Sequence, residues 1–348
     1  MRAAVLHGIG DLRVEDIPEP AVPDGYVLIR VAYNGICGSD LGVIHTFGVS
    51  EVAHPLTGAH GPQVLGHEFS GVVAEVGADV DGIVVGNRVV VQPNYHCGGC
   101  ARCRDGLEHL CEVVAFHGLS APGGGLSEFT AVPAANVHVL PDGVSLEQAA
   151  LVEPLAVTHH AVALAQARPG QFALVIGGGP IGIGTALNLR ASGVERILVS
   201  EASAPRRAIV EGLGLTVVDP LSADVRTAVH ERTDGLGADM VFECAGVAVA
   251  VETALASVRA RGTVVLLATY KEQVPLNTYA LMFSEARVMS SLAYNRDEVA
   301  TVIERMAAGS YPLDGWVERV PLEMVLEGVA DAAAGRRMKV LVEVCGDE

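Results

Sequence analysis

The residues best suited to chemistry in this chain are an imidazole and a carboxylate side by side, in Gly66-His67-Glu68-Phe69-Ser70-Gly71. His is the commonest metal ligand among side chains, and a carboxylate is a harder oxygen donor. By itself, a His-Glu pair is more often a polar surface dipeptide. Two further candidate ligands lie far away in the sequence, Cys37 and Glu153. Cys, His and Glu can bind zinc together and leave a fourth position open, which distinguishes a catalytic zinc from a structural one.

Four of the seven cysteines lie close together, as Cys97-Gly-Gly-Cys100-Ala-Arg-Cys103 and then Cys111. The odd total argues against a fully paired disulfide framework. In a cytosolic chain, clustered thiols are metal ligands more often than bridges. Four thiolates close a tetrahedral cage with no open position, so this pattern predicts a structural zinc. The alternative is four independent buried thiols in a loop.

A nucleotide-binding pattern follows at 172–201. Phe172 to Ile176 is expected to be a buried strand, 183–191 a helix and 196–199 a second strand. The turn between the first strand and the helix has G-x-G-x-x-G spacing, which lets a pyrophosphate approach a helix N-terminus. Its residues are Gly177, Gly179, Pro180, Ile181 and Gly182.

Glu201 lies where a carboxylate accepts from the adenosine ribose hydroxyls. It would repel a 2′-phosphate, so we expect a preference for NAD over NADP. Arg206 and Arg207 follow closely and can hold the adenosine end, so the preference can be incomplete. The alternative for Glu201 is a solvated acid at the end of a strand.

Two domains are expected to position these residues. Residues 1–154 contain short apolar runs and turns, which predict a mainly β, partly open barrel. Cys37 would lie in the loop after a strand at 26–33, with a longer loop at 41–63. Ser145 is a candidate N-cap, and Pro154 is expected to start a helix.

From residue 172 on, strand and helix patterns alternate, with further strands expected at 215–218, 239–244, 262–267 and 288–292. Such alternation is typical of a parallel sheet. We therefore expect an α/β protein, with a doubly wound Rossmann domain at 155–291. A helix near 297–308 and a strand at 339–344 would return the chain to the first domain, as part of 292–348.

Composition excludes several classes of function. The chain has 348 residues, 18% of them charged, and a formal net charge of −18. A surface this acidic repels phosphate backbones, so nucleic acid is not an expected partner. The sequence has no apolar run of the about 18 residues that a membrane span needs. Its first residues do not form a secretory signal, which favours the cytoplasm. With only two lysines, Lys271 and Lys339, a lysine nucleophile is not expected.

These motifs together resemble one family, the zinc-dependent medium-chain alcohol and polyol dehydrogenases. The resemblance covers the whole chain and implies a GroES-like catalytic domain, a Rossmann domain, NAD(H), one catalytic and one structural zinc, and a homo-oligomer (dimer or tetramer). Residues 54–58, 65–71 and 241–246 look like the 2,3-butanediol dehydrogenase branch. That branch is near the sorbitol and threonine dehydrogenases, which remain alternatives. Its substrates are small alcohols or diols, here 2,3-butanediol and acetoin.

Three positions depart from the family pattern. The third zinc ligand is often Cys, and here that position looks like Glu153, as in polyol enzymes. The His that often stands five residues after the ligand cysteine, as part of a proton relay, is replaced by Gly42. Asn87 stands in Gly86-Asn87-Arg88 where the family usually has Asp. The last member of the proton relay therefore stays open, with His45 near in sequence.

The resemblance implies a mechanism and its participants. Zinc held by Cys37, His67 and Glu153, or with Glu68 exchanging in, lowers the pKa of an alcohol oxygen. Ser39 receives the proton, Asp40 orients His67, and hydride passes to the nicotinamide. Two alternatives remain open. The chain could be an inactive zinc- and nucleotide-binding sensor, although the full ligand set argues against it. Zinc-free quinone reductases share the fold but lack these ligands.

Overall fold

The structure is a computed structural model that describes residues 1–346. The chain folds as two units. Unit 1 contains Met1–Glu153, Asn295–Ala308 and the chain from Trp316 on, and unit 2 contains Pro154–Tyr294 and Gly309–Gly315. The short segment Gly309–Gly315 was expected in the first domain. The assignment of zinc chemistry to residues 1–154 and 292–348, and of NAD binding to residues 155–291, stays a prediction.

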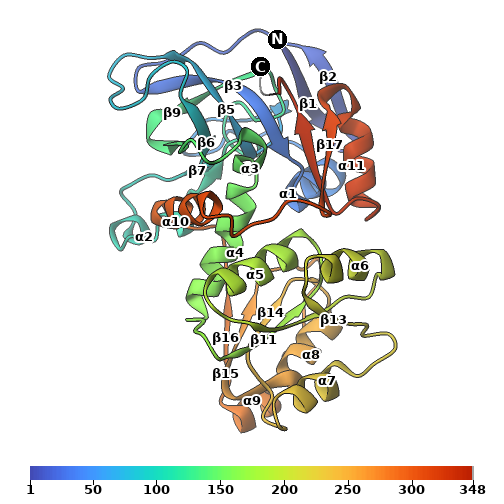
Figure 1. Cartoon of the computed structure of the whole chain (residues 1–348). Helices are drawn as coiled ribbons and strands as arrows, with labels where there is room; N and C mark the ends of the chain where they lie inside the picture. Colours follow the sequence, from blue (N-terminus) through green and yellow to red (C-terminus); the bar gives the residue numbers. More distant parts are fainter. Residues whose placement is uncertain (347–348) are drawn as a thin grey trace. The chain divides into compact units, whose positions relative to one another are not determined.

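Unit 1 is organised around one long central strand, β3, which pairs antiparallel with three others. Its pattern Tyr-Val-Leu-Ile-Arg-Val-Ala-Tyr buries nearly every side chain, as β-branched and aromatic residues favour in a sheet. The strands of this sheet are β3 (Tyr26–Gly35), β5 (Glu68–Val76), β6 (Arg88–Val91), β9 (Phe129–Pro133), β10 (Val137–Val139), β17 (Val317–Pro321) and β18 (Lys339–Glu343). The C-terminal strand β18 thus returns to β3, as expected (Figure 1).

Two smaller sheets complete the strands of unit 1. One contains β2, β1 and β4, and the other is the hairpin of β7 and β8, from which the four-cysteine segment projects. Their bounds are β1 (Arg2–Gly8), β2 (Asp11–Asp16), β4 (Gln63–Val64), β7 (Asn94–Tyr95) and β8 (Ala115–Phe116). A single apolar core joins the main sheet to β1 and to the C-terminal helix α11.

The helices of unit 1 are short. They are α1 (Gly38–Gly42), α2 (Ala101–Arg104), α3 (Leu146–Ala149), α10 (Arg296–Ala307) and α11 (Val325–Ala333), with 3-10 turns η2 (Glu108–Leu110), η3 (Ala134–Asn136) and η4 (Leu322–Met324). Ser145 caps α3 as predicted, since its Oγ accepts from Gln148 N at 3.1 Å. The prediction of a plain loop at 41–63 is wrong at its start, because α1 continues into a π-helical turn, η1 (Val43–Phe47).

Unit 2 is a six-stranded, all-parallel sheet in the order β13-β12-β11-β14-β15-β16. Its strands are β11 (Phe172–Ile176), β12 (Arg196–Ser200), β13 (Thr216–Val218), β14 (Ala238–Glu243), β15 (Val258–Leu266) and β16 (Arg287–Ser290). Alternate side chains of β11 pack on α7 (Val225–Arg232) and α8 (Ala248–Ser257). Val175, on the other face, approaches Gly182 of α5 (Pro180–Ala191). This is the doubly wound fold expected from the sequence, with the strand order reversing beside β11.

The helices of unit 2 connect these strands. They are α5 (Pro180–Ala191), α6 (Ala204–Gly212), α7 (Val225–Arg232), α8 (Ala248–Ser257) and α9 (Thr278–Ser284). Helix α4 (Val152–Leu164) begins two residues before the Pro154 predicted to start it, so Glu153 lies in its first turn.

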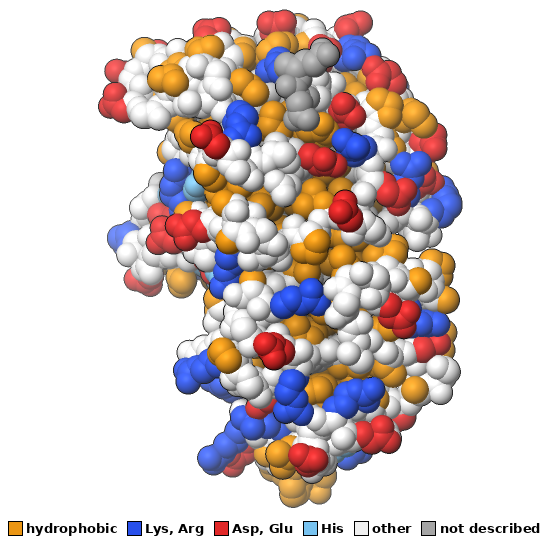
Figure 2. Space-filling model, viewed as in Figure 1, with side chains coloured by type: hydrophobic (Ala, Val, Ile, Leu, Met, Phe, Trp, Pro, Cys, Tyr) orange, Lys and Arg blue, Asp and Glu red, His pale blue; other side chains and the backbone are white. Residues whose placement is uncertain are grey.

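An exposed apolar patch lies on α9, where Tyr279, Met282 and Phe283 are each more than 60% exposed. Figure 2 shows hydrophobic side chains gathered at the end of unit 2 where Figure 1 places this helix. Among residues 1–346, no helix is long and apolar enough to cross a membrane.

Candidate active site

Cys37 lies two residues after the end of the central strand β3 and is the N-cap residue of α1. The turn is closed by Asp40, whose Oδ2 accepts a hydrogen bond from Cys37 N at 2.9 Å. Ser39 lies on the same turn, and its Oγ donates to Cys37 Sγ at 3.1 Å. The sequence Cys-Gly-Ser-Asp therefore holds the thiol by a local backbone arrangement.

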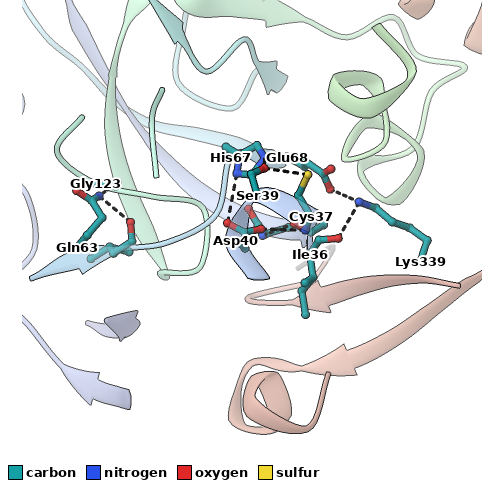
Figure 3. A network of polar contacts seen from close by, with 12 residues as sticks. Ile36, Cys37, Ser39, Asp40, Gln63, His67, Glu68, Gly123 and Lys339 are labelled. Carbon is teal, nitrogen blue, oxygen red and sulfur yellow. Dashed lines mark hydrogen bonds and ion pairs between the residues drawn. The ribbon is translucent and has the colours of Figure 1, made fainter. Parts of the chain in front are cut away.

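His67 and Glu68 reach Cys37 because β5 pairs antiparallel with β3, with Glu68 opposite Gly35. The start of one strand thus meets the end of the other. Gly66, which precedes them, has φ +100°, and a Cβ there would lie 2.7 Å from Leu126 N. One donor atom from each of Cys37, His67 and Glu68 lies within 4.8 Å of the others (Figure 3).

Asp40 also faces the imidazole of His67. Its Oδ1 lies 3.3 Å from His67 Nδ1, an ion-pair distance, although the orientation is too poor for a hydrogen bond. Burial lowers the pKa of His67, but the carboxylate of Asp40 and the thiolate of Cys37 outweigh it and raise the pKa well above its usual value. A carboxylate at Nδ1 leaves Nε2 for a metal, as is usual for metal-binding histidines.

Glu68 forms a buried ion pair with Lys339 of β18. Lys339 Nζ also donates to Ile36 O at 3.0 Å, as Figure 3 shows. Sequence reasoning missed this lysine and treated it only as a poor nucleophile. A signal was present, because a lysine in the apolar strand Lys-Val-Leu-Val needs a buried partner.

Glu153 is buried but does not belong to the group of three donors that lie within 4.8 Å. It is near enough for its charge to act on Lys339. Burial lowers the pKa of Lys339, but Glu68, Cys37 and Glu153 together raise it above its usual value. The structure thus brings Cys37 and His67 together with Glu68, whereas the sequence predicted Glu153 as the third ligand with Glu68 exchanging in.

The chemistry of this donor set fits zinc. Zinc accepts sulfur, nitrogen and carboxylate oxygen together, and a site with three protein ligands keeps a position for substrate. Ser39 lies beside the set, with its Oγ 3.2 Å from His67 Nε2.

The four cysteines between β7 and β8 form the second group of metal-ligand type. All four are free thiols, and the sulfur atoms of Cys100 and Cys103, for example, are 3.5 Å apart, far longer than a disulfide bond. Backbone N–H groups point at the sulfurs, for example Cys100 N at Cys97 Sγ, 3.3 Å away. N–H groups of Glu112 and Cys103 lower the pKa of Cys100 to about 6. The segment Cys97–Cys111 is called the cysteine lobe below.

The predicted nucleotide turn joins β11 to α5, and its glycines have different roles. A Cβ on Gly182 would lie 1.8 Å from Gly177 O, so this glycine allows the helix to pack on the turn. Gly179 is the N-cap of α5 with Pro180 in the first turn, followed by Ile181. A Cβ on Gly179 would approach Arg206 Nη1 at 3.8 Å and no other atom within 4 Å. The helix N-terminus is therefore open to a phosphate, with an arginine beside it.

Glu201 follows β12 and lies against the same turn. Its Oε2 accepts from Gly178 N and its Oε1 from Ser203 N, both at 2.7 Å. Arg207 is held by an ion pair with Asp219 at 3.0 Å. Sequence reasoning did not single out Glu243 at the end of β14, a fully buried carboxylate that accepts from Tyr270 and from two backbone N–H groups.

Two family models match the chain: "Alcohol dehydrogenase GroES-like domain" over residues 23–142 and "Zinc-binding dehydrogenase" over residues 180–308. The chain belongs to the zinc-dependent alcohol dehydrogenase family, as its resemblance to medium-chain dehydrogenases predicted. It is an oxidoreductase acting on alcohols or diols, and it uses zinc and NAD(H).

Individual relatives point to more than one substrate. The chain is 37% identical to a (R,R)-butanediol dehydrogenase of Neisseria gonorrhoeae, over 94% of both chains. It is 36% identical to a 2-dehydro-3-deoxy-L-galactonate 5-dehydrogenase of Pseudoalteromonas atlantica, over 92% of both. The crystal structure of 2R,3R-butanediol dehydrogenase from Bacillus subtilis superposes with a TM-score of 0.92 and 36% identity, covering 99% of each chain.

Proposed function

We propose that Cys37, His67 and Glu153 hold the catalytic zinc, with Glu68 able to exchange in, and that the substrate is a small vicinal diol or the matching hydroxyketone. The observation that supports the proposal is that donor atoms of Cys37, His67 and Glu68 lie within 4.8 Å of one another, with Glu153 buried and close enough for its charge to act on Lys339. When bound, the metal would supply a Lewis acid that lowers the pKa of the alcohol oxygen, and the nicotinamide would supply the hydride acceptor.

The side chains around this point supply orientation and a proton path. Asp40 fixes the imidazole of His67 through Nδ1. Ser39 would take up the proton of the alcohol at its Oγ and release its own hydroxyl proton toward the cofactor ribose and solvent, and this Oγ already lies beside Cys37 and His67. Glu201 and Arg206 bind the adenosine end of the cofactor, and Gly177 to Gly182 receive its pyrophosphate.

Within this family we infer 2,3-butanediol and acetoin as the substrate pair. The names of two of the relatives reported above support this. A vicinal diol also offers a physical reason. With one oxygen at the position left open by Cys37, His67 and Glu153, the neighbouring hydroxyl could donate a hydrogen bond to the Glu153 carboxylate, and this second contact would orient the reacting carbon. A site built around that second hydroxyl rejects an analogue without it.

The test is kcat/KM with NAD for 2,3-butanediol against 2-butanol, sorbitol and L-threonine. We expect kcat/KM to be highest for 2,3-butanediol. A 2-butanol value equal to that of the diol would refute the role of the second hydroxyl. A kcat/KM for sorbitol or threonine that exceeds the diol value tenfold or more, about 1.4 kcal/mol in the transition state, would assign the chain to another branch of the family.

The zinc mechanism is tested by a chelator. NADH formation that a chelator does not abolish would count against this mechanism. No NADH formation with any substrate would favour the inactive sensor.

Cofactor choice has its own test. We expect NAD to be preferred over NADP, because the Glu201 carboxylate repels a 2′-phosphate. Glu201→Ala should narrow the ratio of kcat/KM between the two cofactors by about tenfold, the worth of one charged contact. A wild type that prefers NADP would overturn the assignment. We also propose a homo-oligomer (dimer or tetramer) in the cytoplasm, to be measured by light scattering and cell fractionation.

A further inference from the structure

The buried ammonium of Lys339 is unusual in this chain. Only two of its 23 Lys and Arg residues are lysines, and Lys271 is exposed. Lys339 is 3% exposed and lies on β18, where the next three residues are also buried. A charged lysine is almost never buried without a partner, because desolvation of the ion is costly. Its position therefore needs a reason beyond packing.

The surroundings of Lys339 are built for the ion pair with Glu68. The ammonium is hydrogen-bonded to Ile36 O, one residue before the ligand Cys37. A Cβ on Gly35 would lie 2.1 Å from Glu68 Oε2 and 3.1 Å from Lys339 Cε. The position is glycine because the pair fills that space. The pairing of β5 and β18 with β3 thus places the Glu68 carboxylate against the Lys339 ammonium.

The pair also balances charge at the proposed metal site. Cys37 as thiolate and Glu153 as carboxylate together match the two positive charges of zinc. Glu68 adds a third negative charge within reach of the same donors. The ammonium of Lys339 neutralises this charge through the ion pair. If the ammonium were lost, the buried carboxylate of Glu68 would be left without its partner, and the nearest available cation would be the metal.

We propose that Lys339 is a positioning residue. Its ammonium engages the Glu68 carboxylate, which lies within reach of the Cys37 and His67 donors, and so keeps that carboxylate from binding the catalytic zinc and leaves the fourth coordination position open for the alcohol. Without it, Glu68 becomes a permanent ligand and the site becomes closed, like a structural site. The inference rests on the proposed catalytic zinc at Cys37, His67 and Glu153.

The experiment is a set of cobalt-substituted full-length proteins without substrate, compared by visible absorption and by the rate at which a chelator removes metal. The variants are Lys339→Met, Lys339→Gln, Glu68→Gln and the double variant Lys339→Met/Glu68→Gln. Lys271→Met is the matched control, the same change at an exposed lysine. Cobalt in the cysteine lobe contributes equally to every variant and cancels in difference spectra.

We expect Lys339→Met to change the cobalt spectrum and to slow metal loss by about tenfold, the lower end of effects seen for partners of metal ligands. Glu68→Gln in the same chain should restore the wild-type spectrum and rate. Lys271→Met should change neither. If Lys339→Met does not fold, Lys339→Gln serves instead, because it removes the positive charge and leaves a polar side chain in the buried position.

Either of two results would overturn the proposal: a folded Lys339 variant with the wild-type spectrum and rate, or a changed spectrum that Glu68→Gln does not reverse. Failure of the proposed function itself would be recognised by metal content. The wild type would then bind cobalt in the cysteine lobe alone, and Cys37→Ser would leave the metal content unchanged.

Discussion

The cysteine lobe takes its four donors from residues 97–111, whereas Cys37, His67 and Glu68 come from the end of β3 and the start of β5. The lobe stabilises its thiolates with its own backbone N–H groups. Cys37 is held by Ser39 and Asp40 of its own turn. His67 and Glu68 instead face partners that are distant in the sequence, Asp40 and Lys339. Four donors within one short segment can therefore be brought together by local structure, whereas Cys37, His67 and Glu68 meet only through the pairing of β3 with β5.

The largest expected effect is a loss of activity when the Cys37–His67 site, but not the cysteine lobe, is changed. His67→Ala should lower kcat by about a thousandfold or more, because a metal acting on a developing alkoxide contributes several kcal/mol. The free energy of unfolding and the affinity for NAD should change little, since His67 contributes a ligand and not the core of either unit. Metal analysis should find one zinc per chain in the variant and two in the wild type. A fully active wild type with a single zinc would contradict the distinction.

The opposite pattern is expected in the lobe. Cys100→Ala should remove the second zinc and lower the free energy of unfolding by about 3 kcal/mol, because structural zinc contributes directly to folding. Denaturant titration with metal analysis measures both, and Cys345→Ala, outside both groups, is the control. Retained activity in the folded fraction would agree with a purely structural role. Loss of kcat without loss of stability would show that the lobe takes part in chemistry.

A smaller effect concerns His117, at the base of the lobe just after β8. Its ring is fully buried, contacts Phe69, and exchanges hydrogen bonds with Tyr95 and Thr130. Burial lowers the pKa of His117 to about 3. A lowered histidine pKa means that the folded state resists protonation, so stability is complete above pH of about 6.5 and is lost as the pH falls toward 3.

At pH 5 this single group should cost about 2 kcal/mol relative to pH 7. The measurement is the free energy of unfolding at both pH values in the wild type and in His117→Gln, whose amide keeps hydrogen-bonding capacity without titrating. The wild type should lose about 2 kcal/mol more than the variant. Equal losses would mean that His117 is not a source of acid sensitivity at the base of the lobe.

Much of the architecture could be predicted because it depends on local patterns. The glycine turn at 177–182 and the alternation of strand and helix predicted unit 2, including the approximate bounds of all six strands. The boundaries that failed have local causes. Helix α4 starts at Val152 rather than Pro154, since a proline is tolerated within the first turn of a helix. The π-helical turn after α1 has no periodic signature in a segment rich in Gly and His.

The sequence by itself determined the donor types, the cysteine lobe and the nucleotide turn, because each is set by residue identity and spacing within a short segment. Only the tertiary structure decided which carboxylate lies beside Cys37 and His67, and that Lys339 opposes it. Lys339 and Glu68 are 271 residues apart in the chain. Their meeting depends on the pairing of β18 and β5 with the two sides of β3, and the strand register sets that contact.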